Sequence, residues 1–485
     1  MKQTAYAIVI LCLVLTSMTF GQNIEDDPRL KDVLNLAEKW IEAQQAYNQI
    51  PGISMTLVYK QKVIWRYALG VTDLEKQSKT TTSTIYSICS ISKLFTSIAL
   101  MQLRDQGLIR LDDPIDKHLP WYTLEQSYDQ SAPITIQSLL THSSGLPRES
   151  DYPYWNAPFF EFPTREKMIE QLKNQRTLYC ADTYYQYSNL GLTLAGEIVT
   201  EVSGKDYKTY VIENIIEPLG LKDTRPEMPE DLWGKQLAIG YSARTRDGKR
   251  NKLPFFQANA ITPAAGFTST AEDLSRFAAW QFRLLETNRT EILEANTLRE
   301  MQRVHWLESD WKTARGLGFG VYKNGDRSFV GHYGSCPGYR TGVLLNVPKQ
   351  VAVIFMANAS GIPVGDYIYG MFNLVIPVLT QVLDSPGKGK DIEPSLLQYT
   401  GTYSFYPWGG EVAVFPWQGG LAFADLPSDD PPLEPVKLLH IDGSRFVRIR
   451  KDGDQGEEIE FILGEDGKVK SMKQHSNYWP RINIQ

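Results

Sequence analysis

Hydrophobic residues recur at helical spacing in three stretches of the chain. In residues 90–107 the apolar side chains stand three or four positions apart, and Gly107 is a natural stop. The same spacing predicts helices over residues 30–46 and 190–204, with Gly204 in the position of a C-terminal cap. These stretches predict amphipathic helices that pack one face against a core.

Short runs of apolar and β-branched residues predict strands over residues 54–59, 62–67, 342–347 and 351–357. The last two runs are separated by only Pro348, Lys349 and Gln350, which predicts a hairpin. No fixed-period repeat is visible from residue 22 to about residue 384. We therefore expect this part of the chain to form one large α/β body.

The pattern of hydrophobic and polar residues changes after residues 385–390, whose sequence SPGKGK is typical of a linker. Beyond it, short alternating runs are separated by Gly-Gly and Asp-Gly pairs, which hairpin turns favour. We predict a linker over residues 385–395 and a separate all-β domain over residues 396–485, either a lipocalin-like barrel or a sandwich. Its function is not legible from the sequence.

The first 21 residues have the layout of a secretory signal, with Lys2, an apolar stretch over residues 7–15 and then small polar residues. This apolar stretch is shorter than the roughly 20 residues that cross a bilayer, and we find no second candidate span downstream. We predict a signal peptide over residues 1–21 and export to the periplasm or the outside. No stable membrane span is expected after cleavage.

The composition is that of an ordinary folded protein, with 42% hydrophobic and 22% charged residues. The formal net charge is −6, so the chain lacks the excess of basic residues that binds phosphate backbones, and nucleic acid is not an expected partner. Without Cys12 of the predicted signal, the remaining Cys89, Cys180 and Cys336 are odd in number and lack CxxC spacing, so a disulfide framework is not indicated. The oligomeric state is left open.

Acyl transfer requires a nucleophile, a base beside it and donors for the oxyanion, and a serine motif can supply the first two. There is no GxSxG motif, but Ser90 and Lys93 form an SxxK motif that sets a hydroxyl and an amine about one helical turn apart. The pattern alone is weak because it also occurs at Ser309 and Ser385. Ser90, however, begins an amphipathic helix, whose free N–H groups favour a developing anion. The alternative is an ordinary helix cap beside a surface lysine.

Two further motifs favour the catalytic interpretation. A YxN motif, Tyr187 and Asn189, stands directly before the helix at residues 190–204 and supplies a phenol and an amide. An HxG motif, His332 and Gly334 followed by Ser335, lies between the strand-like residues 328–330 and the strand at residue 342. It is the only HxG in the chain, whereas YxN occurs twice elsewhere.

Taken in order, the three motifs resemble those of the penicillin-recognising serine enzymes, in the branch that holds class C β-lactamases, D-stereospecific peptidases and related esterases. Three further segments resemble that family: RLDDPI at residues 110–115, LLTHSSGLP at residues 139–147 and STAEDL at residues 269–274. The resemblance covers about residues 50–359. It implies an α/β (α+β) fold, a mainly antiparallel sheet flanked by helices with an all-helical region, as a hydrolase domain over residues 22–384.

The resemblance also implies roles for individual residues. Ser90 would be acylated, Lys93 and Tyr187 would share the acid and base work, and Asn189 would orient the substrate. Backbone N–H groups of Ser90 and Ser335 would form the oxyanion hole. No cofactor is implied, and the scattered histidines lack the HxH or HExxH spacing of a metal site.

The main departure from the family pattern is His332, where many relatives carry a lysine. A lysine is a permanent cation that attracts a substrate carboxylate, while histidine at its usual pKa of about 6.5 is mostly neutral at pH 7. We therefore expect a D-peptidase or esterase acting on a small-molecule or peptide substrate, with activity that falls as His332 is protonated. The alternatives are a true β-lactamase and an inactive binding protein on the same fold.

Two other features can be explained by packing alone. Cys89 precedes Ser90 but would point about 100° away from it on a helix, so a buried packing role is favoured over a nucleophilic one. The aromatic run at residues 152–162, interrupted by prolines, either walls a substrate cleft or packs a long connection onto the body.

Overall fold

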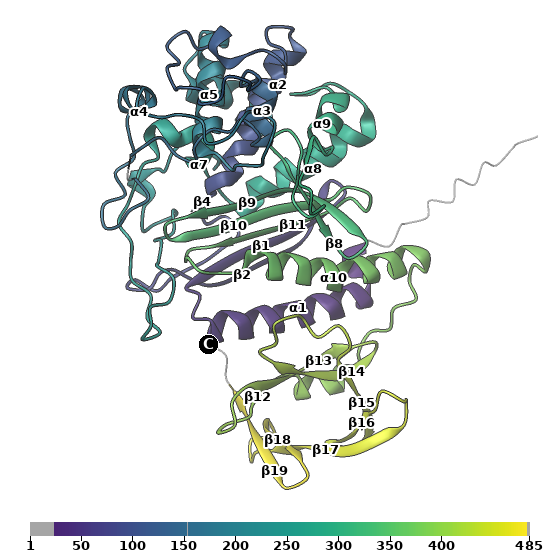
Figure 1. The fold of residues 1–485 in the computed structure, drawn as a ribbon. Coiled ribbons are helices and arrows are strands. Elements are labelled where there is room, and N and C mark those ends of the chain that lie inside the picture. Colours follow the sequence, from purple (N-terminus) through teal and green to yellow (C-terminus); the bar gives the residue numbers. More distant parts are fainter. Residues whose placement is uncertain (1–23, 153, 483–485) are drawn as a thin grey trace, which may run out of the picture.

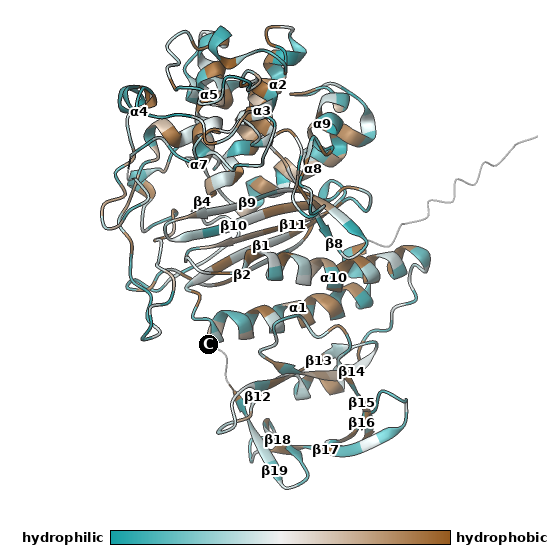
Figure 2. Ribbon diagram, in the orientation of Figure 1, coloured by the Kyte–Doolittle hydropathy of each residue, from teal (hydrophilic) through white to brown (hydrophobic). Residues whose placement is uncertain are grey.

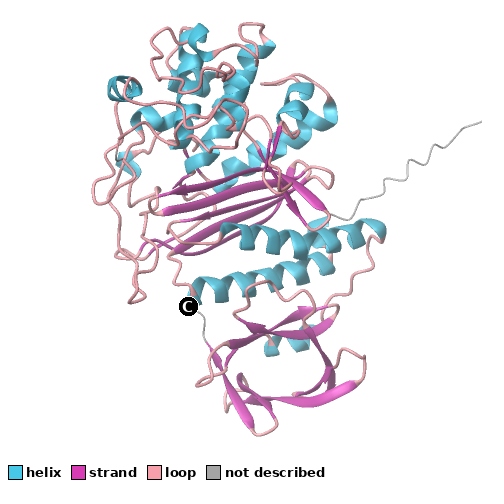
Figure 3. Cartoon of the chain, viewed as in Figure 1, coloured by secondary structure: helices cyan, strands magenta, loops and turns pink. Residues whose placement is uncertain are grey.

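The computed structural model describes residues 24–152 and 154–482, so the predicted signal peptide at residues 1–21 lies outside the described residues. The chain forms four layers: a helical region, a sheet, a pair of long helices and a barrel (Figures 1 and 3). The α-helices are α1 (Pro28–Tyr47), α2 (Ser92–Asp105), α3 (Ile136–Thr141), α4 (Arg165–Leu172), α5 (Asn189–Ser203), α6 (Tyr207–Val211), α7 (Thr262–Ala265), α8 (Ala271–Thr287), α9 (Ala295–Met301) and α10 (Val364–Asp384).

The central sheet has nine strands in the order β3-β2-β1-β11-β10-β9-β8-β7-β6, and its paired strands are antiparallel. Helix α8 packs on one face, and α1 and α10 cover the other (Figure 1). This confirms the predicted antiparallel sheet flanked by helices. Its strands are β1 (Gly52–Tyr59), β2 (Lys62–Asp73), β3 (Ser78–Lys79), β6 (Trp306–Leu307), β7 (Ala314–Arg315), β8 (Gly320–Asn324), β9 (Arg327–Cys336), β10 (Tyr339–Asn346) and β11 (Val351–Ala357), with β4 (Tyr86–Ser87) and β5 (Thr268–Ser269) forming a separate pair.

Most of the local predictions are confirmed. Helices α1 and α5 occupy the two predicted stretches, and Gly204 caps α5 in the left-handed conformation. Strands β10 and β11 form the predicted hairpin, in which Asn346 pairs with Val351. The third helix needs a correction, because residues 89–91 form a short 3-10 turn and α2 begins only at Ser92.

Helix α10 corrects the expectation that no second candidate span exists downstream. By length and composition this 21-residue helix could cross a membrane. In the structure its apolar side chains instead pack against β10, β11 and α1, while hydrophilic residues mark other parts of the helix (Figure 2). A buried core helix meets the same criteria as a membrane span, which is why periodicity is needed to separate them.

The C-terminal part forms a closed eight-stranded barrel around its own apolar interior. A second set of its side chains, on β13 and β14, shares a core with α1 and α10. Polar contacts also link the two parts: Trp40 Nε1 donates to Ser428 O at 2.9 Å, and Gln418 N donates to Asp32 Oδ2 at 2.6 Å. The strands are β12 (Gly401–Ser404), β13 (Glu411–Trp417), β14 (Gly420–Leu426), β15 (Val436–Asp442), β16 (Arg445–Ile449), β17 (Gln455–Leu463), β18 (Val469–Gln474) and β19 (Asn477–Ile482).

Candidate active site

The turn that carries Ser90 joins β4 to α2. Its residues Cys89 and Ile91 are fully buried, whereas Ser90 is partly exposed. Cys89 has a φ of +52°, which residues with a side chain seldom adopt. The turn therefore presents the Ser90 hydroxyl while its neighbours anchor it in the core.

Lys93 is fully buried one turn after Ser90. Its Nζ donates to Ser90 Oγ at 3.2 Å, to Asn189 Oδ1 at 2.7 Å and to Ala264 O at 2.8 Å. Burial lowers the pKa of Lys93 to about 7, although the nearby Glu149 carboxylate opposes this shift. About half of the amine is then unprotonated at neutral pH, which is what a general base for Ser90 requires.

Tyr187 lies beside both groups. Lys93 Nζ is 4.8 Å from the centroid of the Tyr187 ring. Burial raises the pKa of Tyr187 to about 12, and the neighbouring Ser90 hydroxyl partly offsets this shift. The phenol is therefore protonated at neutral pH and suits the donation of a proton better than its removal.

Asn189 is the first residue of α5, directly after Ser188, whose side chain caps the helix by accepting from Gly191 N at 2.8 Å. The two ends of the Asn189 amide have different partners. Its Oδ1 accepts from Lys93, and its Nδ2 donates to Glu149 Oε1 at 2.7 Å. The amide is thus held in one orientation with its oxygen toward the SxxK motif.

The HxG motif lies within β9, which corrects the expectation that it follows the strand. Gly334 is required there by close packing: a Cβ would stand 2.3 Å from Ile88 O and 2.1 Å from Thr341 Oγ1. The strand therefore runs directly against the turn that carries Ser90. The site lies where this strand meets α2 and α5 of the helical region (Figure 1).

His332 is buried and neutral. Its Nδ1 donates to Tyr333 O at 2.6 Å, so Nε2 is the acceptor nitrogen of the ring. Burial, Lys93 and Arg315 together lower its pKa to about 3. The expectation that His332 is protonated near its usual pKa is therefore wrong, because burial beside two cations disfavours the charged ring.

Sequence reasoning missed Arg315, on β7. Its Nη2 and Nε donate to the Tyr185 hydroxyl at 2.8 and 3.1 Å, and its guanidinium lies 5.0 Å from the centre of the Tyr185 ring. Among the described residues, no carboxylate forms an ion pair with Arg315. A positive charge thus acts on His332 even though the HxG motif has no lysine. No motif marks this arginine in the sequence.

Sequence reasoning also missed Glu149, which stands two residues after the LLTHSSGLP segment. Besides Asn189, it accepts a hydrogen bond from the Tyr154 hydroxyl. Tyr154 is fully buried, so this member of the aromatic run packs and supports the site, whereas Phe159 is 71% exposed. Proximity to the LLTHSSGLP segment was the one available signal.

Cys89 and Cys336 are both buried, as the packing interpretation of Cys89 predicts. Burial raises the pKa of the Cys89 thiol, which disfavours the reactive thiolate. In the part of the chain that the structure describes, no group of three His, Cys, Asp or Glu side chains could hold a metal ion.

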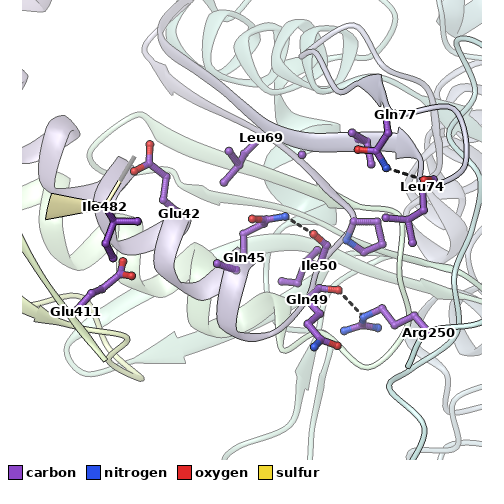
Figure 4. Close-up of a pocket in the computed structure, with 14 residues that line it drawn as sticks. Glu42, Gln45, Gln49, Ile50, Leu69, Leu74, Gln77, Arg250, Glu411 and Ile482 are labelled. Atoms are coloured by element: carbon purple, nitrogen blue, oxygen red, sulfur yellow. Dashed lines mark hydrogen bonds between the residues drawn. The ribbon is translucent and has the colours of Figure 1, made fainter. Parts of the chain in front are cut away.

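A hollow of about 570 Å³ lies elsewhere, between α1, β2 and the barrel (Figure 4). Arg250 Nε donates to Gln49 O at 2.8 Å at its edge, and Glu42 and Glu411 approach it from α1 and from the barrel. Its lining holds none of the predicted site residues and no serine, cysteine, lysine or histidine. It therefore lacks the groups that acyl transfer needs.

Comparison with known proteins agrees with this geometry. A family model described as "Beta-lactamase" matches residues 37–368. "Beta-lactamase-like protein 2" of Dictyostelium discoideum is 27% identical over 398 residues, 80% of this chain and 71% of that protein. "Protein flp" of Staphylococcus aureus strain N315 is 25% identical over 321 residues. This match covers 66% of this chain and only 62% of the length of flp.

Solved structures share the fold at lower identity. The octameric penicillin-binding protein homologue from Pyrococcus abyssi has a TM-score of 0.63 and 23% identity, covering 92% of this chain and 99% of its own. D-amino acid amidase from Ochrobactrum anthropi SV3 has a TM-score of 0.59 and 23% identity, and the match covers 73% of this chain and 99% of the amidase. Beta-lactamase/D-alanine carboxypeptidase from Yersinia pestis has a TM-score of 0.60 and 21% identity, and the match covers 72% of this chain and 98% of that protein.

Proposed function

Because the chain belongs to the beta-lactamase family, we propose that it is a serine hydrolase that cleaves an amide or ester bond through an acyl-enzyme on Ser90. The observation that carries the proposal is the meeting of two distant segments at one hydroxyl. Ser90 Oγ lies 3.2 Å from Lys93 Nζ, Asn189 binds the same amine, and the Tyr187 ring lies 4.8 Å from it. A nucleophile, a base and an acid are thus within proton-transfer reach.

In this proposal the neutral Lys93 amine takes the proton of Ser90 as its oxygen attacks the substrate carbonyl carbon. The N–H groups of Ser90 and Ser335 stabilise the oxyanion that forms. As the carbonyl re-forms, the bond to the leaving group breaks and Tyr187 protonates that group, regaining its proton from Lys93. A water molecule then attacks the acyl carbon and transfers a proton to Lys93. The ester bond to Ser90 Oγ breaks, the acid is released, and Lys93 returns that proton to the Ser90 oxygen.

We favour a D-peptidase or esterase over a true β-lactamase. The support is His332, which stands where many relatives have a lysine, and the shared fold with a protein named as a D-amino acid amidase. Arg315 acts on His332 through its charge and offers a replacement cation. Substrates that carry a carboxylate near the scissile bond are therefore the proposed preference.

The test is covalent labelling. A fluorophosphonate incubated with the full chain should add to Ser90, seen by mass spectrometry of the tryptic peptide, and Ser90→Ala should abolish both the adduct and hydrolysis of p-nitrophenyl acetate. An unlabelled Ser90, with no turnover of esters, D-aminoacyl amides or β-lactams, would support the alternative of an inactive binding protein. Nitrocefin turnover faster than ester and amide turnover would instead favour a true β-lactamase.

Export and domain division belong to the same proposal. Residues 1–21 act as a signal peptide, residues 22–384 as the hydrolase domain, residues 385–395 as the linker and residues 396–485 as the β domain. Cell fractionation with mass spectrometry of the first residues tests export: a cytoplasmic chain that retains residues 1–21 contradicts it. The substrate itself is a small molecule or a peptide.

A further inference from the structure

A chain of hydrogen bonds leads away from Ser90 into the helical region. It runs from Ser90 to Lys93, from Lys93 to the oxygen of Asn189, and from the nitrogen of Asn189 to Glu149, which in turn accepts from Tyr154. The first three groups belong to the SxxK and YxN motifs. The last two belong to neither and have no part in the mechanism above.

The backbone before Glu149 is fixed against the start of α5. Asn189 N and Leu190 N donate to Arg148 O at 2.8 and 3.1 Å, and Ser188 Oγ donates to Pro147 O at 2.7 Å. Gln175 Nε2 donates to the carbonyl of Glu149 itself at 2.9 Å. The segment is therefore held in register with the YxN motif, and the Glu149 carboxylate has little freedom to leave Asn189.

Glu149 also supplies the nearby negative charge that bears on Lys93. Burial lowers the pKa of Lys93, and the Glu149 carboxylate is the strongest influence in the opposite direction. The other titratable or charged groups that face or interact with Lys93 are Arg148, His142, His332, Tyr187, Cys89 and Cys336. Arg148 disfavours the protonated amine, and the two buried histidines have lowered pKa values and are neutral near pH 7.

We propose that Glu149 is a positioning residue, which locks the Asn189 amide with its oxygen on Lys93 and supplies the negative charge that Lys93 experiences through that amide. This role rests on the proposed function. A neutral side chain at position 149 would release the amide to rotate, because its nitrogen would lose a charged acceptor. It would also leave the buried Lys93 cation less stabilised, so the amine would lose its proton at lower pH.

The variant Glu149→Gln keeps the shape and removes the charge. We expect the rate of Ser90 labelling by a fluorophosphonate to fall about tenfold at its plateau, as one charge-assisted hydrogen bond is lost. The acid limb of the pH–rate profile should move about one unit lower, the effect of one charge at this range. The matched control is Glu197→Gln, a buried residue of α5 whose carboxylate pairs with Arg165 instead. Its limb should coincide with that of the unmodified protein.

A second variant separates the effect of the charge at position 149 from the effect of the side-chain length. Glu149→Asp keeps the charge on a shorter side chain, so its plateau rate should fall while its limb stays near the original pH. Circular dichroism at each pH verifies that both variants are folded, and Glu149→Asp decides the matter if Glu149→Gln does not fold. The proposed role of Glu149 is overturned if the acid limb of the pH–rate profile stays in place in Glu149→Gln, or if it moves to lower pH in Glu149→Asp. In either case continued labelling of Ser90 would still support the proposed function. Absence of Ser90 labelling in the unmodified protein overturns both.

Discussion

The candidate site gathers several buried ionisable side chains around one hydroxyl, whereas the ion pairs of the barrel lie on its surface. At the site, Lys93 and His332 are buried and Tyr187 is partly buried, and burial shifts the pKa of each group so that its neutral form is favoured. On the barrel, pairs such as Arg445 with Asp442 are roughly half exposed and lie on the surface. Enclosed groups with shifted pKa values are the mark of a reacting centre, whereas solvated pairs serve solubility.

Their interiors differ in the same direction. The barrel encloses apolar and aromatic residues such as Phe446 and Phe461, which pack on each other with ring centroids 5.3 Å apart. The site instead encloses a connected set of hydrogen bonds around Lys93. The difference supports the proposal that the chemistry belongs to the α/β body. Three substitutions and one change of pH test this contrast.

The largest effect is expected from Lys93→Met, which fills the same space without a base. Labelling of Ser90 and ester hydrolysis should fall by about 10²- to 10⁴-fold, the usual contribution of a general base. Lys473→Met on the barrel, where Lys473 pairs with Glu460 at 3.1 Å, is the matched control and should leave both rates unchanged. Equal rates in the two variants would remove Lys93 from the mechanism.

Acidification should produce the next largest effect. Because the pKa of Lys93 is lowered to about 7, the neutral base is lost as the pH falls through that value. The labelling rate should therefore drop about a hundredfold between pH 8 and pH 5. A limb that persists in His332→Asn supports Lys93 as the titrating group, and a limb that vanishes in that variant would return the assignment to His332.

Arg315→Met should produce a smaller, selective effect. We expect kcat/KM for a substrate that carries a carboxylate to fall about tenfold or more, since a charge-assisted hydrogen bond contributes roughly 1.5–3 kcal/mol. The same substrate with its carboxylate amidated is the internal control and should change little. An equal loss for both substrates would mean that Arg315 only packs against Tyr185 and Tyr322.

The smallest effect should come from the barrel surface. Arg450→Ala removes an exposed ion pair with Asp452, so the free energy of unfolding should change by no more than about 1 kcal/mol. The rate of Ser90 labelling should stay the same. A measurable change in that rate, with the fold intact by circular dichroism, would show that the barrel surface influences the site.

Local patterns were sufficient for the parts of the fold that depend on local physics. The periodicity of residues 30–46 and 190–204 predicts α1 and α5, and the short gap at residues 348–350 predicts the β10–β11 hairpin. The positive φ of Cys89, which moves the start of α2 to Ser92, was not predictable because no local residue preference favours it. Surrounding packing holds that conformation against its steric cost.

The order of the three motifs and the helical or extended form of several segments follow from the sequence, because spacing along the chain sets which side chains share a helix face or a strand. Which groups are enclosed together depends on the tertiary structure. Burial beside Lys93 and Arg315 gives His332 its low pKa, and the crossing of distant segments brings Glu149 to Asn189. The same holds for β13, where Val414 faces the barrel interior and Phe415 the core with α1, because alternation cannot tell which of two faces meets a partner.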